Sequence, residues 1–204
     1  MPIKIFFADE MRYGLMTNLK RNWNRIGKRT KIAHSIGYAN RYLYTAISPV
    51  DGDIFNMLGF DDASTKETNI FLEELKLMYP NNYIVIVWDN APFHKPQILK
   101  EKENMSIVYL PSYGQELNPV ERFFGEMRKY TANKTFDDIE TIEKELENGV
   151  INWQNDKEKV KQLTYWDWIE SRLKRHWNIS LFFKWYYAST FRCCKCRYKF
   201  SKKW

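Results

Sequence analysis

One six-residue segment, YIVIVW at 83–88, constrains the fold more than any other part of this sequence. It is an almost continuous apolar run rather than an alternating one, which is the pattern of a strand buried on both faces. An acid, Asp89, follows it directly. Because a doubly buried strand needs cover on both sides of its sheet, the segment favours an α/β fold in which helices flank a mixed sheet.

Other segments predict the neighbouring strands. Residues 2–8 (PIKIFFA) are typical of a strand that stops at the acidic pair Asp9 and Glu10. Residues 31–39 and 41–48 are rich in β-branched and aromatic side chains, and a Pro-Val-Asp-Gly turn then leads into DIFNMLGF. We therefore expect an antiparallel meander over 30–60, and a further strand at 106–110 (SIVYL).

Helical periodicity begins at Ser64, which has capping-box spacing to Glu67 and precedes an apolar stripe that ends at Pro80. A short helix is predicted from about Pro96 to Glu103. The order of strands and helices is that of an α/β domain, and a composition break near 170 is the candidate boundary.

Two later segments also predict helices. Asn118 can cap the first, Pro119 suits its first position, and four apolar residues share one face: Val120, Phe123, Phe124 and Met127. The second lies near 136–153 and has its own apolar side: Ile139, Ile142, Leu146, Val150 and Trp153.

The net charge of +7 comes from the last part of the chain. Residues 171–204 hold 10 of the 32 Lys and Arg and no acid, which leaves 22 basic and 25 acidic residues in 1–170. The body has one basic stretch, interleaved with Trp23, whose two interpretations we weigh equally: a phosphate-backbone contact or a solvated loop. Its members are Lys20, Arg21, Arg25, Lys28, Arg29 and Lys31.

All three cysteines lie in the tail, where Cys193 and Cys196 form a single C-x-x-C. A structural zinc site needs four ligands, so the tail does not favour one. The N-terminal apolar run is too short for a signal peptide, and no apolar run reaches about 18 residues. We expect a cytoplasmic protein with no membrane segment.

Three acids form the candidate catalytic set. Asp9 and Asp89 each follow a predicted strand, and Glu121 lies one turn into the helix after the next strand. Ligands of open α/β sheets gather at the carboxyl ends of the strands, so the three can converge there. Clustered carboxylates repel unless cations bridge them, and such oxygen ligands suit Mg²⁺ or Mn²⁺, with two ions able to serve a phosphodiester displacement. Taken singly, each acid can be a turn or capping residue, and for Asp9 alone that interpretation is favoured.

The sequence motifs around these acids resemble those of a known family. "FADEMRYGL", "VWDNAPFHK" and "YLPSYGQELNPVERFFGEMRK" resemble the three catalytic blocks of DDE transposases of the mariner-like superfamily, in its bacterial insertion-sequence branch. The resemblance covers about residues 3–169. It implies a ribonuclease H-like fold, metal ligation by Asp9, Asp89 and Glu121, and metal-dependent cleavage and strand transfer of transposon DNA.

The resemblance also implies partners and supporting residues. Family members act as dimers on paired DNA ends, and they carry a helix-turn-helix region that this sequence does not show before its first block. We expect either that a separate chain carries this region or that the present chain is an inactive transposase remnant. The residues expected to contact DNA or to support the site are Asn90, His94, Lys95, Arg122 and Arg128.

Some features depart from the family pattern. The loop at 112–115 reads Ser-Tyr-Gly-Gln rather than Pro-Tyr-Ser-Pro, and 31 residues separate Asp89 from Glu121, slightly fewer than usual. Glu126 is an alternative third ligand, discounted because it lies outside the N-P-V-E word. We expect residues 1–170 to form the catalytic domain and 171–204 to be a basic aromatic tail, either disordered read-through or a DNA-binding extension. A different nuclease on the same fold is the remaining alternative.

Overall fold

The computed structural model describes residues 1–29, 31–91, 104–111, 114–166 and 169. The predicted helix at 96–103, the tail at 171–204 and both His94 and Lys95 lie outside these residues. The chain divides into two compact units, Met1–Tyr165 and Trp166–Trp204. Within the described residues, no helix is long and apolar enough to cross a membrane.

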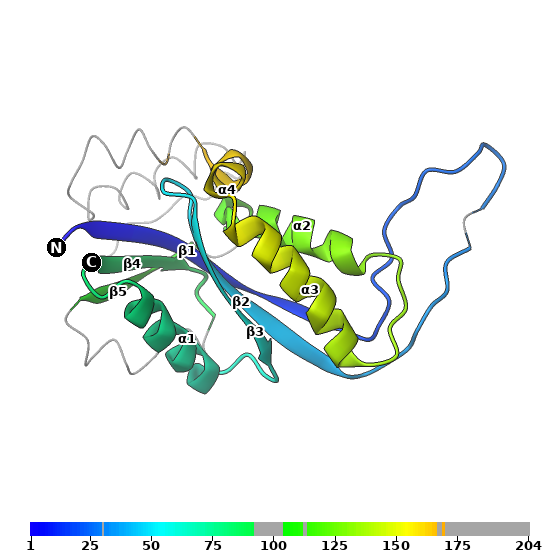
Figure 1. Cartoon of the computed structure of the whole chain (residues 1–204), viewed down its shortest axis with the longest axis horizontal. Helices are drawn as coiled ribbons and strands as arrows, with labels where there is room; N and C mark the ends of the chain where they lie inside the picture. The colour runs from blue at the N-terminus through cyan, green and yellow to red at the C-terminus, as the bar shows by residue number, and fades with distance from the viewer. Residues whose placement is uncertain (30, 92–103, 112–113, 167–168, 170–204) are drawn as a thin grey trace, which may run out of the picture. The chain divides into compact units, whose positions relative to one another are not determined.

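A five-stranded mixed sheet organises the first unit, with strand order β3-β2-β1-β4-β5 (Figure 1). The strands are β1 (Ile3–Gly14), β2 (Asn40–Ser48), β3 (Asp53–Phe60), β4 (Tyr83–Trp88) and β5 (Met105–Tyr109). β1 runs antiparallel to β2 and parallel to β4, and β5 continues the parallel half. The predicted α/β class and mixed sheet are confirmed. β4 is flanked on both sides by other strands, and all its residues after the first are buried.

One predicted strand is longer in the structure, and one segment that was predicted as extended forms no strand. β1 does not stop at Asp9 but continues to Gly14, because its antiparallel ladder with β2 extends beyond the ladder with β4. Residues 31–39, predicted as extended, form no strand where the structure describes them. They belong to a long excursion between β1 and β2, coloured blue in Figure 1, whose own pairing consists of a few hydrogen bonds near its base.

The helices of this unit are α1 (Thr65–Met78), α2 (Val120–Thr131), α3 (Ile139–Gln154) and α4 (Lys157–Thr164). Ser64 caps α1 as predicted, since its hydroxyl accepts from the Lys66 amide and also contacts Glu67. The apolar stripes predicted for α2 and α3 are buried. Helix α4 was not predicted from the sequence, although the Asp156 side chain caps it in the ordinary way by accepting from the Lys159 amide.

The two faces of the sheet bury different helices. Phe6 and Ala8 of β1 pack in one cluster with Phe71 and Leu75 of α1. Side chains alternate along a strand, so the odd-numbered residues of β1 point to the opposite face. There α2 contacts β1 and α3 contacts β3. Asp9 therefore lies on the face that α2 covers.

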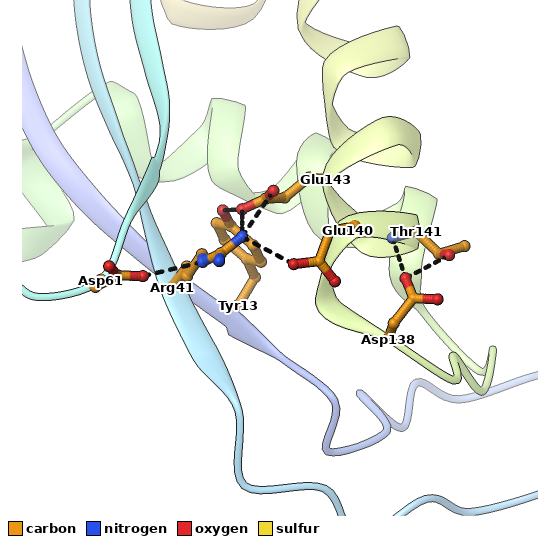
Figure 2. A network of polar contacts seen from close by, with 7 residues as sticks. All are labelled: Tyr13, Arg41, Asp61, Asp138, Glu140, Thr141 and Glu143. Atoms are coloured by element: carbon orange, nitrogen blue, oxygen red, sulfur yellow. Dashed lines mark hydrogen bonds and ion pairs between the residues drawn. The ribbon is translucent and has the colours of Figure 1, made fainter.

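A polar network fastens α3 to the sheet on that same face (Figure 2). The Tyr13 hydroxyl donates to Glu143 at 2.7 Å, and Arg41 Nη1 lies 3.0 Å from both carboxylate oxygens of Glu143. Arg41 also pairs with Asp61 through its Nε at 3.0 Å. Because these contacts join β1, β2 and α3, they fix where α3 sits and so support the packing of its neighbour α2.

Candidate active site

Asp9 lies inside β1, at the point where that strand loses its β4 neighbour. The last pair of the β1–β4 ladder is Phe7 with Val87. Continued for two residues in the same parallel register, the ladder brings Asp9 level with Asp89, which follows β4. On its other side Asp9 pairs with Thr45 of β2, a fully buried residue. The two aspartates thus come together through strand register rather than through proximity in the sequence.

Glu121 approaches Asp9 from α2, the helix that covers this face of the sheet. It is the second residue of α2, which begins one residue later than predicted, with Pro119 in the N-cap position. Asn118 still accepts the Val120 amide through Oδ1 at 3.1 Å, so the predicted side-chain cap is present. The Asn118 Nδ2 donates to the Ala8 carbonyl at 2.9 Å, which holds the helix start beside β1.

The charges of the other two predicted ligands act on Asp9. Its pKa is raised from 3.8 to about 8, first by burial and then by the charges of Glu10, Glu121 and Asp89. A hydrogen bond from the Glu10 amide to Asp9 Oδ1, 2.9 Å long, acts in the opposite direction. Like charges that raise a carboxyl pKa in this way make the site favourable for a cation.

The carboxylates do not form a ready coordination sphere. Within the described part of the chain, no three acidic, histidine or cysteine side chains are gathered closely enough to hold a metal ion. Three like charges repel one another, so a cation would have to draw these side chains together. The donor set itself suits Mg²⁺ or Mn²⁺, since all of its oxygens are hard ligands.

The Asp89 carboxylate is oriented by the backbone that follows it. Its Oδ1 accepts from the Ala91 amide at 3.1 Å, as in an Asx turn. Asn90, expected to orient Asp89, is exposed. A role for Asn90, like the roles of His94 and Lys95, stays a prediction.

The basic residues of α2 are already engaged. Arg128 Nη1 lies 3.6 Å from Glu121 Oε2, so one carboxylate of the set has an arginine counter-ion. Arg122 Nη1 donates to the Leu163 carbonyl at 3.2 Å, which ties α2 to the end of α4. Glu126, the discounted alternative ligand, pairs with Lys129 at 2.5 Å. The sequence did not predict the Arg128–Glu121 pair, although helical spacing of seven residues places both on one side of α2.

The basic excursion between β1 and β2 carries exposed aromatic and aliphatic side chains. Trp23 and Ile26 are fully exposed. Its base is held by Asn133, which stands at φ 58° just after α2. The Asn133 amide donates to the Asn18 carbonyl at 2.8 Å, and its Oδ1 accepts from the Lys20 amide at 2.9 Å. The excursion is thus anchored beside the α2 helix that carries Glu121.

The chain matches a known protein family. A model described as DDE superfamily endonuclease matches residues 4–143. The chain belongs to the DDE superfamily endonucleases. This confirms the DDE family that the three sequence blocks predicted. Its insertion-sequence branch stays a prediction.

Solved structures share the fold of this DDE endonuclease. The present chain is similar to the Mos1 strand transfer complex, with a TM-score of 0.59 and 15% sequence identity. The match covers 79% of this chain and 50% of the Mos1 chain. This chain is also similar to the mariner Mos1 paired-end complex with Mg, with TM-score 0.56 and 17% identity, over 78% and 53% respectively. These matches confirm the ribonuclease H-like fold.

One curated relative is an uncharacterized protein, y4pE/y4sA, of Sinorhizobium fredii. It is 34% identical over 61 residues, which are 29% of this chain and 45% of that protein. The DDE endonuclease chain therefore spans about half the length of the proteins that it matches.

Proposed function

We propose that this chain is the catalytic domain of a DNA transposase, in which Asp9, Asp89 and Glu121 bind divalent metal ions for strand cleavage and strand transfer. The observation that carries the proposal is electrostatic. Charges on Glu121 and Asp89 raise the pKa of Asp9, although the three residues come from separate parts of the chain. A DDE endonuclease needs such a set of acids at one edge of its sheet.

Asp9, Asp89 and Glu121 would hold the divalent ions, two in our proposal, and these ions would supply an activated nucleophile and stabilise the leaving oxygen of a phosphodiester. Asp9 lies in β1 and Asp89 directly follows the neighbouring strand β4, so they suit a shared ligand role. Glu121 approaches from α2 and completes the set. Its pairing with Arg128 balances the carboxylate charge in the protein without metal, and the same guanidinium can contact a DNA phosphate once Glu121 binds metal.

DNA is the substrate that the surface supports. The excursion carries six basic side chains in a short stretch of the chain, and the exposed Trp23 lies among them. Basic and aromatic side chains together bind a phosphate backbone and stack on bases. We propose further that the chain acts as a homodimer on paired ends and that a separate chain carries the helix-turn-helix.

Nicking of supercoiled plasmid DNA carrying the element's ends tests the proposal. We expect cleavage that requires Mg²⁺ or Mn²⁺ and falls to background in Asp89→Ala and Glu121→Gln. Glu126→Gln is the matched control, because it makes the same change on the same helix and leaves the proposed ligands intact. Circular dichroism should show all three variants folded.

Two results would count against the proposal. Cleavage that persists in Asp89→Ala, or that needs no metal, would place the chemistry elsewhere. Absence of metal-dependent nicking in the wild-type chain, even with the helix-turn-helix partner added, would show that the chain is an inactive remnant.

A further inference from the structure

Asn118 is a buried side chain that joins β1 to the start of α2. It is only 2% exposed. Its Nδ2 donates to the Ala8 carbonyl at 2.9 Å, and its Oδ1 accepts from the Val120 amide at 3.1 Å. Both ends of the amide are therefore used, which is what a polar group at this depth requires.

The two hydrogen bonds end beside two of the proposed ligands. Ala8 directly precedes Asp9, and Val120 directly precedes Glu121. The bond from Asn118 to Ala8 spans 110 positions of the sequence. It lies where the β1–β4 ladder has just ended at Phe7, so a side-chain hydrogen bond to β1 forms at the point where the pairing with β4 stops.

Few side chains can make both bonds. Serine is a good helix cap but is too short to reach the Ala8 carbonyl from the same position. Aspartate offers the acceptor for Val120 but, when ionised, has no donor for Ala8. Asparagine is therefore more than a helix cap at this position, because capping alone leaves its Nδ2 bond unexplained.

We propose that Asn118 is a positioning residue, which sets the distance between the Asp9 and Glu121 carboxylates by tying their neighbouring backbone groups together. The inference rests on the proposed function, since it concerns the same metal site. Groups that orient metal ligands commonly matter to affinity almost as much as the ligands do. Asn118 would act here through the backbone of β1 and α2, without itself touching a metal ion.

Direct Mn²⁺ binding to the full chain, followed by electron paramagnetic resonance of the free ion, tests the proposal without relying on catalysis. Asn118→Ser keeps a capping oxygen for Val120 and loses the bond to Ala8. Asn118→Ala loses both. Asp138→Ala is the matched control, because it removes the cap of α3, where Asp138 Oδ1 accepts from the Thr141 amide at 2.7 Å. Urea unfolding of each variant measures stability separately.

We expect Asn118→Ser to weaken Mn²⁺ binding by about 10-fold to 100-fold. Its unfolding midpoint should fall no further than that of Asp138→Ala, whose Mn²⁺ affinity should stay at the wild-type value. Asn118→Ala should bind Mn²⁺ as weakly as Asn118→Ser while being less stable. Such a separation of affinity from stability is not expected of a helix cap alone.

Other results would overturn the inference. Wild-type Mn²⁺ affinity in Asn118→Ser would show that the Ala8 bond does not position the ligands, and the proposed function would stand. An equal loss of affinity in Asp138→Ala would mean that general loosening of the fold is responsible. If the wild-type chain itself bound no Mn²⁺, the proposed function would fail, and the positioning role with it.

Discussion

Replacing Asp9 with asparagine should change how the stability of the metal-free chain depends on pH. The substitution keeps the shape of the side chain and an oxygen that can accept the Glu10 amide, but it removes the titratable group. In the wild-type chain, burial and the charges of Glu10, Glu121 and Asp89 raise the pKa of Asp9 from 3.8 to about 8. The folded chain thus binds this proton more tightly than the unfolded chain does.

The sign of the effect follows from that difference. Between pH 4 and 8 the folded state holds the proton more than the unfolded state, so the stability contributed by protonated Asp9 is full below about pH 4 and is lost as the pH rises to about 8. A roughly ten-thousandfold difference in proton affinity corresponds to about 5–6 kcal/mol. Asp9 is partly exposed, so water screens its charge, and we expect about 2–3 kcal/mol to be realised.

Urea unfolding between pH 4 and 9, in the presence of a chelator, measures this difference. The wild-type chain should lose stability relative to Asp9→Asn as the pH rises, and the gap should level off above about pH 8. Asp137→Asn, which neutralises an exposed acid, should run parallel to the wild type. Added Mn²⁺ at 100 times its dissociation constant should restore about 2.7 kcal/mol to the wild type but not to Asp9→Asn. Parallel curves for the wild type and Asp9→Asn would refute the reasoning.

Four further substitutions, one of them a control, test the packing that holds the site, each by urea unfolding. Phe71→Ala, at a fully buried position of α1, should cost about 3–5 kcal/mol, and a loss as small as that of a surface change would contradict the core assignment. Glu143→Ala, which breaks the 3.0 Å pair with Arg41, should cost about 1–3 kcal/mol, whereas Glu140→Ala at the exposed edge of that network should cost less than about 1 kcal/mol. Equal losses would show that the network does not anchor α3. Gly52→Ala should lower the free energy of unfolding by about 1–3 kcal/mol or more. The φ of Gly52 is 72°, and an added Cβ would collide with the carbonyl oxygen of Lys157, the first residue of α4. An unchanged urea midpoint would mean that the turn adapts.

Local sequence was sufficient for the elements whose pattern spans a few residues. The unbroken apolar run of β4, the capping pair at the start of α1 and the apolar stripe of α2 each reflect interactions between residues close in sequence. Such patterns predict an element and its buried side without knowledge of its neighbours. The end of β1 could not be predicted in this way, because it depends on how far β2 pairs with it.

The site divides in the same manner. Asp9, Asp89 and Glu121 could be named from the words around them, and their residue types alone indicated an affinity for divalent cations. The effect of Asp89 and Glu121 on the pKa of Asp9, by contrast, arises only because the register of β1 and β4 and the position of α2 bring separate segments together. The same is true of Asn118. The sequence predicted that it caps the start of α2, whereas its hydrogen bond to the Ala8 carbonyl depends on the fold.

The sequence by itself therefore determined the identity of the acids and the type of those elements whose pattern spans a few residues. It did not predict α4, and the strand that it predicted at 31–39 is absent from the described residues there. Tertiary structure decided the length of β1, the raised pKa of Asp9 and the second hydrogen bond of Asn118. Those properties depend on distances between atoms far apart in the chain, and strand pairing and helix packing fix such distances.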